Sequence, residues 1–304
     1  MKLGLIVPYR NRQKHLDIFL SHMKEYLDKH NIDFHIYIIH QYDKYLFNRG
    51  AMLNIGLDIS FNYVDYFCLH DIDILVQNVN NIYHYRDNPT NLLRNYPDIT
   101  ISNDSKLFGG IVTINKEHLK RVNGFSNNFW GWGGEDGDFR RRLEQENIKW
   151  ERELTAVHRI LSHNRTYLGY PNSEKKIVGN SNIYNIDLLC NLGKLHMLNY
   201  KKDGLNEVNY EIVETIKINE YASMFNVINK NIPEYDLNNK ISYKLIYELL
   251  KNKYKNKYTK DFHNKILNIH TKQKLSYREQ KIYIKNYYND FLYILFVLCT
   301  SIFV

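Results

Sequence analysis

The stretch Gly124–Leu143, GFSNNFWGWGGEDGDFRRRL, places tryptophans and glycines directly before an acidic cluster and a helix-like run. Glycine lets the backbone approach a ligand closely, and tryptophan offers a flat apolar face on which a sugar ring can stack. Acids at the start of a helix lie at its positive end, so they stay ionised. The pattern predicts a polyol-binding site of carboxylates beside an aromatic wall. The alternative is a tight turn with acidic capping residues.

The segments before this stretch alternate between short apolar runs and amphipathic runs. Short apolar runs predict strands, and apolar residues at helical spacing predict helices. The order strand, helix, strand, helix, strand predicts an α/β domain with a parallel sheet. In chain order, the predicted elements are Leu3–Val7, Gln13–His30, His35–His40, Asn48–Ile59 and Tyr66–Leu69.

Further elements follow an irregular, polar segment over residues 78–108. Gly109–Ile114 is a predicted strand, and Ile148–Glu153 a predicted edge strand. Two helices are predicted between these strands, at Lys116–Val122 and at Asp138–Gln145.

A change in composition predicts the domain boundary. Residues 1–225 form the predicted α/β domain, and residues 226–304 a helical appendage rich in Lys, Asn and Tyr. Phe291–Val304 is almost wholly apolar. Because a membrane span needs about 20 residues and this run is shorter, we expect a buried final helix rather than a membrane anchor.

The bulk composition restricts the class of protein only loosely. The 304 residues are 44% hydrophobic and carry a net charge of +8, which suits an anionic ligand, a nucleic acid or an anionic membrane surface. Cys68, Cys190 and Cys299 show neither a disulfide framework nor a zinc pattern, which favours a reducing compartment. The chain opens directly into a strand-like run without a signal peptide, so we expect a cytoplasmic protein.

Charged side chains fall where the predicted strands end, which is where ligands bind in parallel α/β sheets. Asp71 and Asp73 follow the third strand, and two carboxylates on one face suit a hard divalent cation. The alternative is a solvated acidic turn. Arg10, Arg12 and Arg49 could grip phosphate oxygens, or they could form an ordinary basic rim.

Two histidines, His158 and His163, lie downstream of the acidic stretch. A lone histidine is usually structural, but neutral imidazole is also a common metal ligand. Taken together, these features describe a nucleotide-sugar transferase. A cation at Asp73 would neutralise a diphosphate, Trp132 would form the floor of the sugar site, and a carboxylate would deprotonate the acceptor hydroxyl.

The chain resembles the beta-1,4-galactosyltransferase family over about residues 1–217, which implies a GT-A, Rossmann-like fold. The similarity to the xylosylprotein galactosyltransferase branch is greater than to the N-acetylglucosamine branch. The matching stretches, in family order, are VPYRNR (Val7–Arg12), FNRGAMLNIG (Phe47–Gly56), HDID (His70–Asp73), FGG (Phe108–Gly110), NGFSNNFWGWGGED (Asn123–Asp136) and DGLNEVNY (Asp203–Tyr210).

The resemblance implies a role for particular side chains. Asp136 is the implied general base, Glu135 holds a sugar hydroxyl of the acceptor, and Trp132 bridges donor and acceptor. Asp73 and His163 are the implied ligands of Mn²⁺. The implied UDP-sugar site is formed by Pro8, Arg10, Arg12, Phe47, Arg49, Asp71, Leu107, Gly110 and Trp132.

Three positions depart from the family pattern. Gly137 stands where an acid commonly follows the Glu-Asp pair. Residues 160–162, Ile-Leu-Ser, hold no obvious further metal ligand, so water or His158 would complete the shell. Leu107 replaces the aromatic residue that the family places before Phe-Gly-Gly.

The sequence therefore predicts an Mn²⁺-dependent inverting transferase that moves galactose or N-acetylgalactosamine from UDP to a hydroxyl of a glycan or glycoconjugate. One alternative is a transferase that uses UDP-glucose or UDP-N-acetylglucosamine. Another is a sugar-binding protein with weak catalysis, which Gly137 favours. A nucleic-acid-binding protein is suggested only by the basic, tyrosine-rich tail, which carries no recognisable binding motif, so no nucleic-acid partner is expected.

Overall fold

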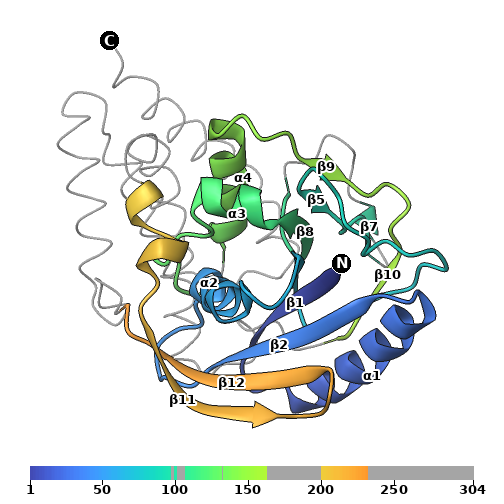
Figure 1. The fold of residues 1–304 in the computed structure, drawn as a ribbon, viewed down its shortest axis with the longest axis horizontal. Coiled ribbons are helices and arrows are strands. Elements are labelled where there is room, and N and C mark those ends of the chain that lie inside the picture. Colours follow the sequence, from blue (N-terminus) through green and yellow to red (C-terminus); the bar gives the residue numbers. More distant parts are fainter. Residues whose placement is uncertain (97–98, 101–106, 132, 163–199, 232–304) are drawn as a thin grey trace, which may run out of the picture. The chain divides into compact units, whose positions relative to one another are not determined.

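The computed structural model describes residues 1–96, 99–100, 107–131, 133–162 and 200–231 (Figure 1). Trp132, His163 and the predicted appendage after residue 231 lie outside the described residues. The chain divides into two compact units, Met1–Tyr235 and Asp236–Val304. The first unit thus extends beyond the boundary expected at residue 225. The helical appendage stays a prediction from composition.

Within these ranges, eight strands form one mixed sheet in the order β11-β12-β2-β1-β3-β8-β5-β9. Its central strands β12, β2, β1 and β3 are parallel, as expected, but β8 and β11 run antiparallel to their neighbours. The expectation of a parallel sheet is therefore confirmed for these four strands and wrong for β8 and β11. A parallel return needs a long crossover, usually a helix, and no helix is present among the described residues between β3 and β8. The strands are β1 (Lys2–Tyr9), β2 (Asp33–Gln41), β3 (Tyr66–His70), β5 (Thr90–Asn91), β8 (Ile111–Asn115), β9 (Glu151–Arg152), β11 (Tyr210–Lys217) and β12 (Ala222–Asn229).

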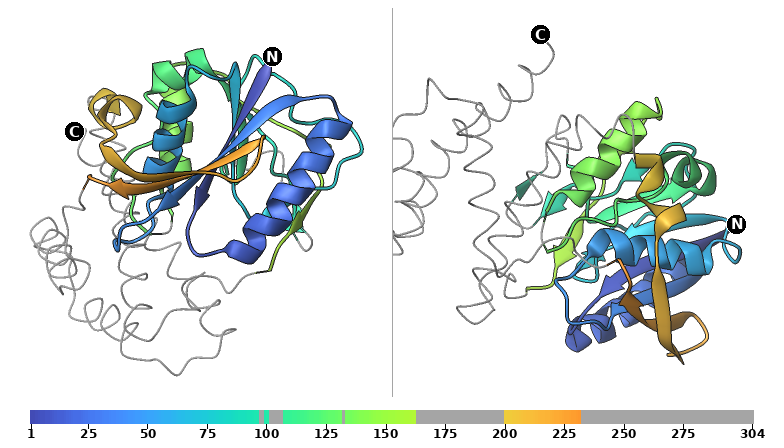
Figure 2. Two further views of the ribbon diagram at one scale, coloured as in Figure 1. Left: turned by 60° about the horizontal axis from the view of Figure 1, so that its bottom comes forward. Right: turned by 90° about the vertical axis from the view of Figure 1, so that its left-hand side faces the viewer.

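Helices cover both faces of this sheet (Figure 2). Alternate residues of β1 point to opposite faces, so Leu3 and Leu5 pack with α1 (Gln13–Lys29), whereas Ile6 packs on the other side. That second side is covered by α2 (Arg49–Ser60), α3 (Lys116–Val122) and α4 (Glu135–Gln145). The result is a three-layer α/β/α arrangement that leaves the carboxyl ends of β1, β2 and β3 at one edge.

Local sequence explains how α2 is held against β1. A Cβ atom on Gly56 would lie 2.3 Å from Cγ2 of Ile6, so only glycine lets the helix approach so closely. Asn48 caps the helix, since its side chain accepts a hydrogen bond from the amide of Ala51 at 2.8 Å. This close packing and the cap fix the position of Arg49 at the first turn.

Helix α4 begins earlier than the sequence suggested. The predicted helix started at Asp138, but the observed one starts at Glu135 after Gly134, whose φ is +100°. Positive φ is costly for any residue with a Cβ, so the glycines allow the sharp entry. Glu135 and Asp136 consequently lie in the first turn of α4, at the positive end of the helix.

The remaining elements are short or lie at the edges. The β11–β12 hairpin was not predicted, although β12 is inserted beside β2 and continues past residue 225 to Asn229. In the described part of the chain, two small sheets pair β4 (Ile74–Val76) with β10 (His158–Ile160) and β6 (Asn95–Tyr96) with β7 (Ile99–Thr100). The 3-10 turns described there are η1 (Tyr200–Lys202) and η2 (Leu205–Glu207). No helix in the described part of the chain is long and apolar enough to cross a membrane.

Candidate active site

Arg49 joins two carboxylates from different parts of the chain. Its Nε donates to Oδ1 of Asp71 at 2.8 Å, and its Nη1 donates to Oδ1 of Asp136 at 2.8 Å. Oε1 of Glu135 lies 3.8 Å from the same Nη1. The first turns of α2 and α4 thus meet the end of β3 at one guanidinium, whose fork suits paired oxygen acceptors. The structure therefore brings together four of the predicted site residues.

The pKa values of two carboxyl groups around Arg49 are raised. Burial raises the pKa of Glu135 to about 8, and the neighbouring Asp136 charge acts in the same direction. Burial also raises the pKa of Asp71 above its ordinary value, while Arg49 opposes that rise. Three ionised carboxylates beside one guanidinium in a buried site repel one another, so one of them is more stable in its protonated form. Burial therefore favours the protonated form of Glu135 at neutral pH, which corrects the expectation that the acids at the start of this helix stay ionised.

Asp71 is oriented by its backbone neighbours. Its amide donates to the carbonyl of Gly110 at 2.9 Å, and its own carbonyl lies 2.8 Å from Nδ1 of His70. Burial lowers the pKa of His70 to about 3, so the ring is neutral. Neutral His70 donates through Nδ1 to Asp71, and its Nε2, 2.8 Å from the hydroxyl of Tyr83, accepts from that group.

Asp71 and Asp73 do not lie on a strand face as the sequence suggested. β3 ends at His70, and residues 71–73 form the turn into β4. The two side chains consequently diverge to different arginines. Asp71 contacts Arg49, and Oδ2 of Asp73 lies 3.3 Å from Nη1 of Arg12.

The chain approaches Asp73 just before His163. β10 pairs with β4, and the amide of Leu161 donates to the carbonyl of Asp73 at 2.7 Å. His163, the second predicted metal ligand, lies outside the described residues. No group of three or more His, Cys, Asp or Glu side chains that could hold a metal occurs within the described ranges.

Arg10 organises a loop at the end of β2. Its guanidinium donates to the carbonyls of Gln41, Asp43 and Tyr45 at 3.2, 2.7 and 2.6 Å. It also lies 5.9 Å from the centre of the Phe47 ring. Arg10 therefore holds the loop that carries Phe47, rather than projecting all its donors toward a ligand. Pro8, near the end of β1, pairs in register with Ile39 of β2.

The Phe-Gly-Gly run forms a wall beside Asp136. A Cβ on Gly109 would lie 1.9 Å from Oδ2 of Asp136, so this glycine is required by close approach. Gly110 has a φ of +79°. Leu107 is 42% exposed, and its carbonyl accepts from Nη2 of Arg152 at 2.5 Å. The run thus places Gly109 against Asp136, with the exposed Leu107 two residues before it.

Trp130 of the glycine-rich stretch lies in the protein core. Trp130 is 1% exposed and packs edge-on against Tyr45 with ring centres 5.8 Å apart. It is a core residue, so it does not form an open aromatic wall. Trp132, the predicted sugar-stacking residue, lies outside the described residues.

Several asparagines that the sequence did not single out hold the acidic loop in place. Nδ2 of Asn48 donates to the carbonyl of Asn127 at 2.7 Å. Nδ2 of Asn54 donates to the carbonyl of Phe125 at 2.8 Å and to Oδ1 of Asn127 at 2.9 Å. Asn48 and Asn54 lie inside the matching stretch of α2, but their partners are more than 70 residues away. The signal available in the sequence was a pair of asparagines next to apolar residues at core spacing.

Two family models cover most of the described core. Residues 1–86 match the N-terminal region of glycosyl transferase group 7, and residues 96–167 match the N-terminal domain of galactosyltransferase. The chain belongs to the beta-1,4-galactosyltransferase family. Both models fall on the segments that form the Arg49 cluster.

Relatives in this family are similar over most of the first unit. Human beta-1,4-galactosyltransferase 4 is 34% identical over 218 residues, which cover 70% of this chain and 59% of that protein. Human beta-1,4-galactosyltransferase 7 is 29% identical over 233 residues, which cover 75% of this chain and 67% of that protein. The chain thus spans about three-fifths of the length of the first of these relatives.

Solved structures of a family member share the fold. The catalytic domain of Drosophila beta-1,4-galactosyltransferase 7 in complex with xylobiose superposes with a TM-score of 0.58 at 26% identity, covering 78% of this chain and 96% of that one. A mutant of the same enzyme, in complex with manganese, UDP-Gal and xylobiose, gives a TM-score of 0.59 at 25% identity and the same coverage. The mixed α/β sheet of this chain therefore has the GT-A galactosyltransferase architecture.

Proposed function

We propose that this chain is an inverting glycosyltransferase that moves galactose or N-acetylgalactosamine from a UDP-sugar to a hydroxyl of a sugar acceptor, in an Mn²⁺-dependent reaction. The observation that carries the proposal is the Arg49 cluster. It joins Asp71, an implied donor contact, to Asp136, the implied base, through hydrogen bonds of 2.8 Å on each side. Donor and acceptor chemistry would thus meet at one guanidinium.

The donor side of the proposed site is formed by the ends of β1, β2 and β3. Arg12 and Arg49 supply fixed positive charge for the diphosphate, which a planar guanidinium can bind through two oxygens. The loop held by Arg10 would present Phe47 to the nucleotide, and Pro8 lies near the end of β1 on the same side of the proposed site. Gly110 and Leu107 border the sugar of the donor.

Transfer then requires one proton acceptor and one displacement. The carboxylate of Asp136 takes the proton of the acceptor hydroxyl as that oxygen attacks the anomeric carbon. The bond from this carbon to the diphosphate oxygen breaks, and its electron pair leaves with UDP. Because attack and departure occur on opposite faces, the anomeric centre is inverted. Glu135, protonated at neutral pH, donates a hydrogen bond to an acceptor hydroxyl.

The residues present suit a divalent cation. Asp73 offers a carboxylate in a turn beside the end of β3, and the chain reaches its carbonyl at Leu161, two residues before His163. Carboxylate and imidazole ligands are compatible with manganese. When bound, the cation would supply positive charge for the leaving diphosphate. A relative of this family has been solved with manganese and UDP-Gal.

A screen of donors and acceptors tests the proposal. The full chain would be incubated with Mn²⁺, one of four UDP-sugars (galactose, N-acetylgalactosamine, glucose or N-acetylglucosamine), and either xylobiose or N-acetylglucosamine as acceptor. We expect acceptor-dependent release of UDP with the galactose-type donors. Turnover with glucose-type donors alone would favour the alternative donor class. Binding of UDP and acceptor without any turnover would favour the sugar-binding alternative, which the glycine at position 137 first suggested.

A further inference from the structure

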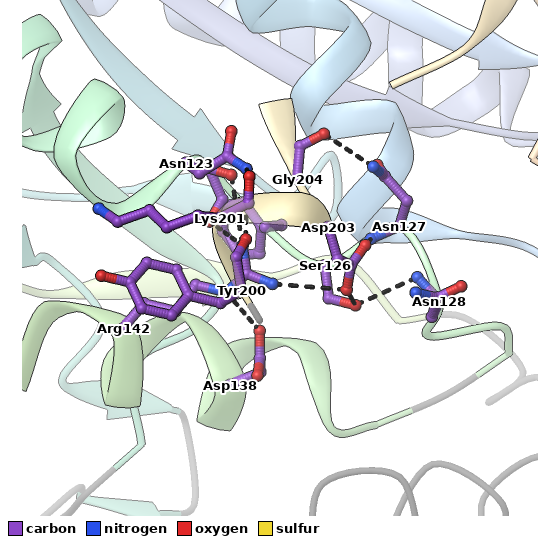
Figure 3. Close-up of polar contacts among 12 residues, drawn as sticks. Asn123, Ser126, Asn127, Asn128, Asp138, Arg142, Tyr200, Lys201, Asp203 and Gly204 are labelled. Atoms are coloured by element: carbon purple, nitrogen blue, oxygen red, sulfur yellow. Dashed lines mark hydrogen bonds and ion pairs between the residues drawn. The ribbon is translucent and has the colours of Figure 1, made fainter. Parts of the chain in front are cut away.

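Asp203 lies between the loop at residues 126–128 and helix α4 (Figure 3). Its Oδ1 accepts from the amide of Asn127 at 2.8 Å, and its Oδ2 accepts from the hydroxyl of Ser126. Nη2 of Arg142, on α4, lies 3.6 Å from the same Oδ2. One carboxylate therefore contacts both the loop that leads into the glycine-rich stretch and the helix that carries Glu135 and Asp136.

The contact with α4 is made deep in the protein. The side chains of Arg142 and Asp138 are both 0% exposed, and Nε of Arg142 donates to Oδ2 of Asp138 at 2.8 Å. Nη1 of Arg142 also donates to the carbonyl of Gly124 at 3.1 Å. Buried charges need matched partners. Asp203 supplies the second carboxylate near this arginine, so it helps to fix α4 relative to the loop.

The contact with the loop extends to Arg49. The amide of Asn127 donates to Asp203, and the carbonyl of Asn127 accepts a hydrogen bond from Nδ2 of Asn48 at 2.7 Å. Asn48 caps α2 through the amide of Ala51, and Arg49 is the next residue. Asp203 is thus connected by two short paths to the two groups that meet in the cluster, Arg49 through Asn127 and Asp136 through Arg142.

We propose that Asp203 is a positioning residue for the transfer reaction, which holds Asp136 and Arg49 in register without touching substrate; this inference rests on the proposed function. A displacement of about 1 Å in a reacting group can cost on the order of 100-fold in rate. Asp203→Ala should therefore lower kcat by roughly 10- to 100-fold. The Kd for UDP should rise by a smaller factor than kcat falls, because Arg49 is the only proposed nucleotide contact on the path from Asp203, and the contacts proposed for Arg12 and Phe47 stay in place.

The same segment offers a matched control. Glu146, at the end of α4, accepts from the hydroxyl of Tyr200 and from Nζ of Lys201 at 2.8 Å. These contacts hold η1 against the protein but do not reach the loop at residues 126–128. Glu146→Gln should loosen the segment and keep kcat within about twofold of wild type. Ser126→Ala, which removes one of the Asp203 contacts, should give an intermediate loss.

The experiment compares the full-length wild type with these three variants by steady-state kinetics, UDP binding, thermal unfolding and amide hydrogen exchange. We expect Asp203→Ala to accelerate exchange in residues 124–131 and in the first turn of α4 by at least tenfold, with no such change in Glu146→Gln. Unchanged exchange in these segments overturns the inference, whether or not the wild type is active. Equal losses of kcat in Asp203→Ala and Glu146→Gln also overturn it. A wild type without turnover on any donor contradicts the proposed function alone, because the exchange measurement still decides the role of Asp203.

Discussion

The guanidinium of Arg49 donates to Oδ1 of Asp136 at 2.8 Å, across a separation of 87 residues in the chain. The same group donates to Asp71 through a different nitrogen, so its planar fork spans two carboxylates. An ammonium group is a single point charge and cannot reproduce this geometry. The relationship makes Arg49 the structural centre of the proposed site.

Arg49→Lys should separate charge from geometry. The positive charge is retained, but one carboxylate loses its partner, so kcat/KM should fall by roughly 100-fold and the free energy of unfolding by about 1–2 kcal/mol. Kinetics and urea unfolding measure the two effects. Arg121→Lys is the control, because Arg121 contacts Glu146 at 3.8 Å on the surface, where ion pairs contribute little. Wild-type activity in Arg49→Lys would show that the two-carboxylate geometry of the guanidinium is not needed for the reaction.

Asp136→Asn keeps the shape of the side chain but removes the proton acceptor. A general base contributes typically 10²–10⁴-fold, so kcat should fall by about that factor while UDP affinity changes little. Glu135→Gln is the comparison at the adjacent position. Because the pKa of Glu135 is raised to about 8, it is already protonated at pH 7 and resembles glutamine there. The kcat of Glu135→Gln should therefore fall by only about tenfold at that pH. A larger fall of kcat in Glu135→Gln than in Asp136→Asn would assign the general base to Glu135.

The sequence predicted the α/β class of the fold and named four residues that the structure brings together at Arg49, but it did not show the contacts through which distant residues meet. Apolar runs located β1, β2 and β3, and helical spacing located α1, α2 and α3, because burial imposes a period on these segments. The pattern could not show the antiparallel β8 or the β11–β12 hairpin. Strand direction depends on connections, and β11 is largely exposed, so it lacks a continuous apolar signal.

Pairwise contacts were the least predictable part of the site. Asp71 and Asp73 were correctly placed after β3, but the turn that separates their side chains is set by β4 pairing with β10. Arg142 and Asp138 are four residues apart, which suggests a helical ion pair. Nothing in a single sequence places Asp203 beside them, since the contact of Asp203 with Ser126 spans 77 residues.

His158 should make the protein sensitive to acid. It is 5% exposed on β10, and neither ring nitrogen has a hydrogen-bond partner within the described ranges. Burial lowers its pKa to about 4, against about 6.5 when unfolded. A lowered folded-state pKa gives stability that is present above pH 6.5 and lost as the pH falls through 4. The loss amounts to about 3 kcal/mol by linkage.

His158→Leu should abolish that loss, because leucine carries no charge into the apolar site. Urea unfolding at pH 7.5 and pH 4 measures the free energy of unfolding in each protein. His84→Leu, at an exposed position, is the control and should keep the wild-type pH dependence. His158→Leu also tests whether His158 completes the metal site. Loss of Mn²⁺ binding in this variant would make His158 a metal ligand.

Asp73→Ala should abolish metal-dependent binding of UDP. The carboxylate is one of two proposed Mn²⁺ ligands, so its removal should raise the Kd for Mn²⁺ and eliminate turnover. Titration calorimetry of UDP with Mn²⁺, and again with EDTA, measures the dependence directly. Asp17→Asn, an exposed change on α1, should behave as wild type. Full activity of the wild type in EDTA would contradict a metal-dependent reaction.

Leu107 should broaden the choice of donor. The family resemblance places an aromatic residue, commonly tyrosine in members that prefer galactose, before the Phe-Gly-Gly run. That ring would crowd the C2 substituent of the donor sugar and offer it a hydroxyl. Leu107 is 42% exposed, two residues before the glycine that lies against Asp136, and its carbonyl accepts a hydrogen bond from Arg152. Leucine leaves room and an apolar surface for the methyl of an N-acetyl group.

The expected size of this effect follows from the surface that one methyl buries. Burial of a methyl is worth about 0.8 kcal/mol, so discrimination between donors should be several-fold rather than absolute. Wild type should use UDP-N-acetylgalactosamine at least comparably to UDP-galactose, and Leu107→Tyr should shift the ratio of kcat/KM toward galactose. Leu154→Tyr, at a position that is 49% exposed, controls for the added ring. Because both donors share UDP, a changed ratio cannot come from altered nucleotide binding; an unchanged ratio would mean that Leu107 only packs the wall and that another side chain selects the donor.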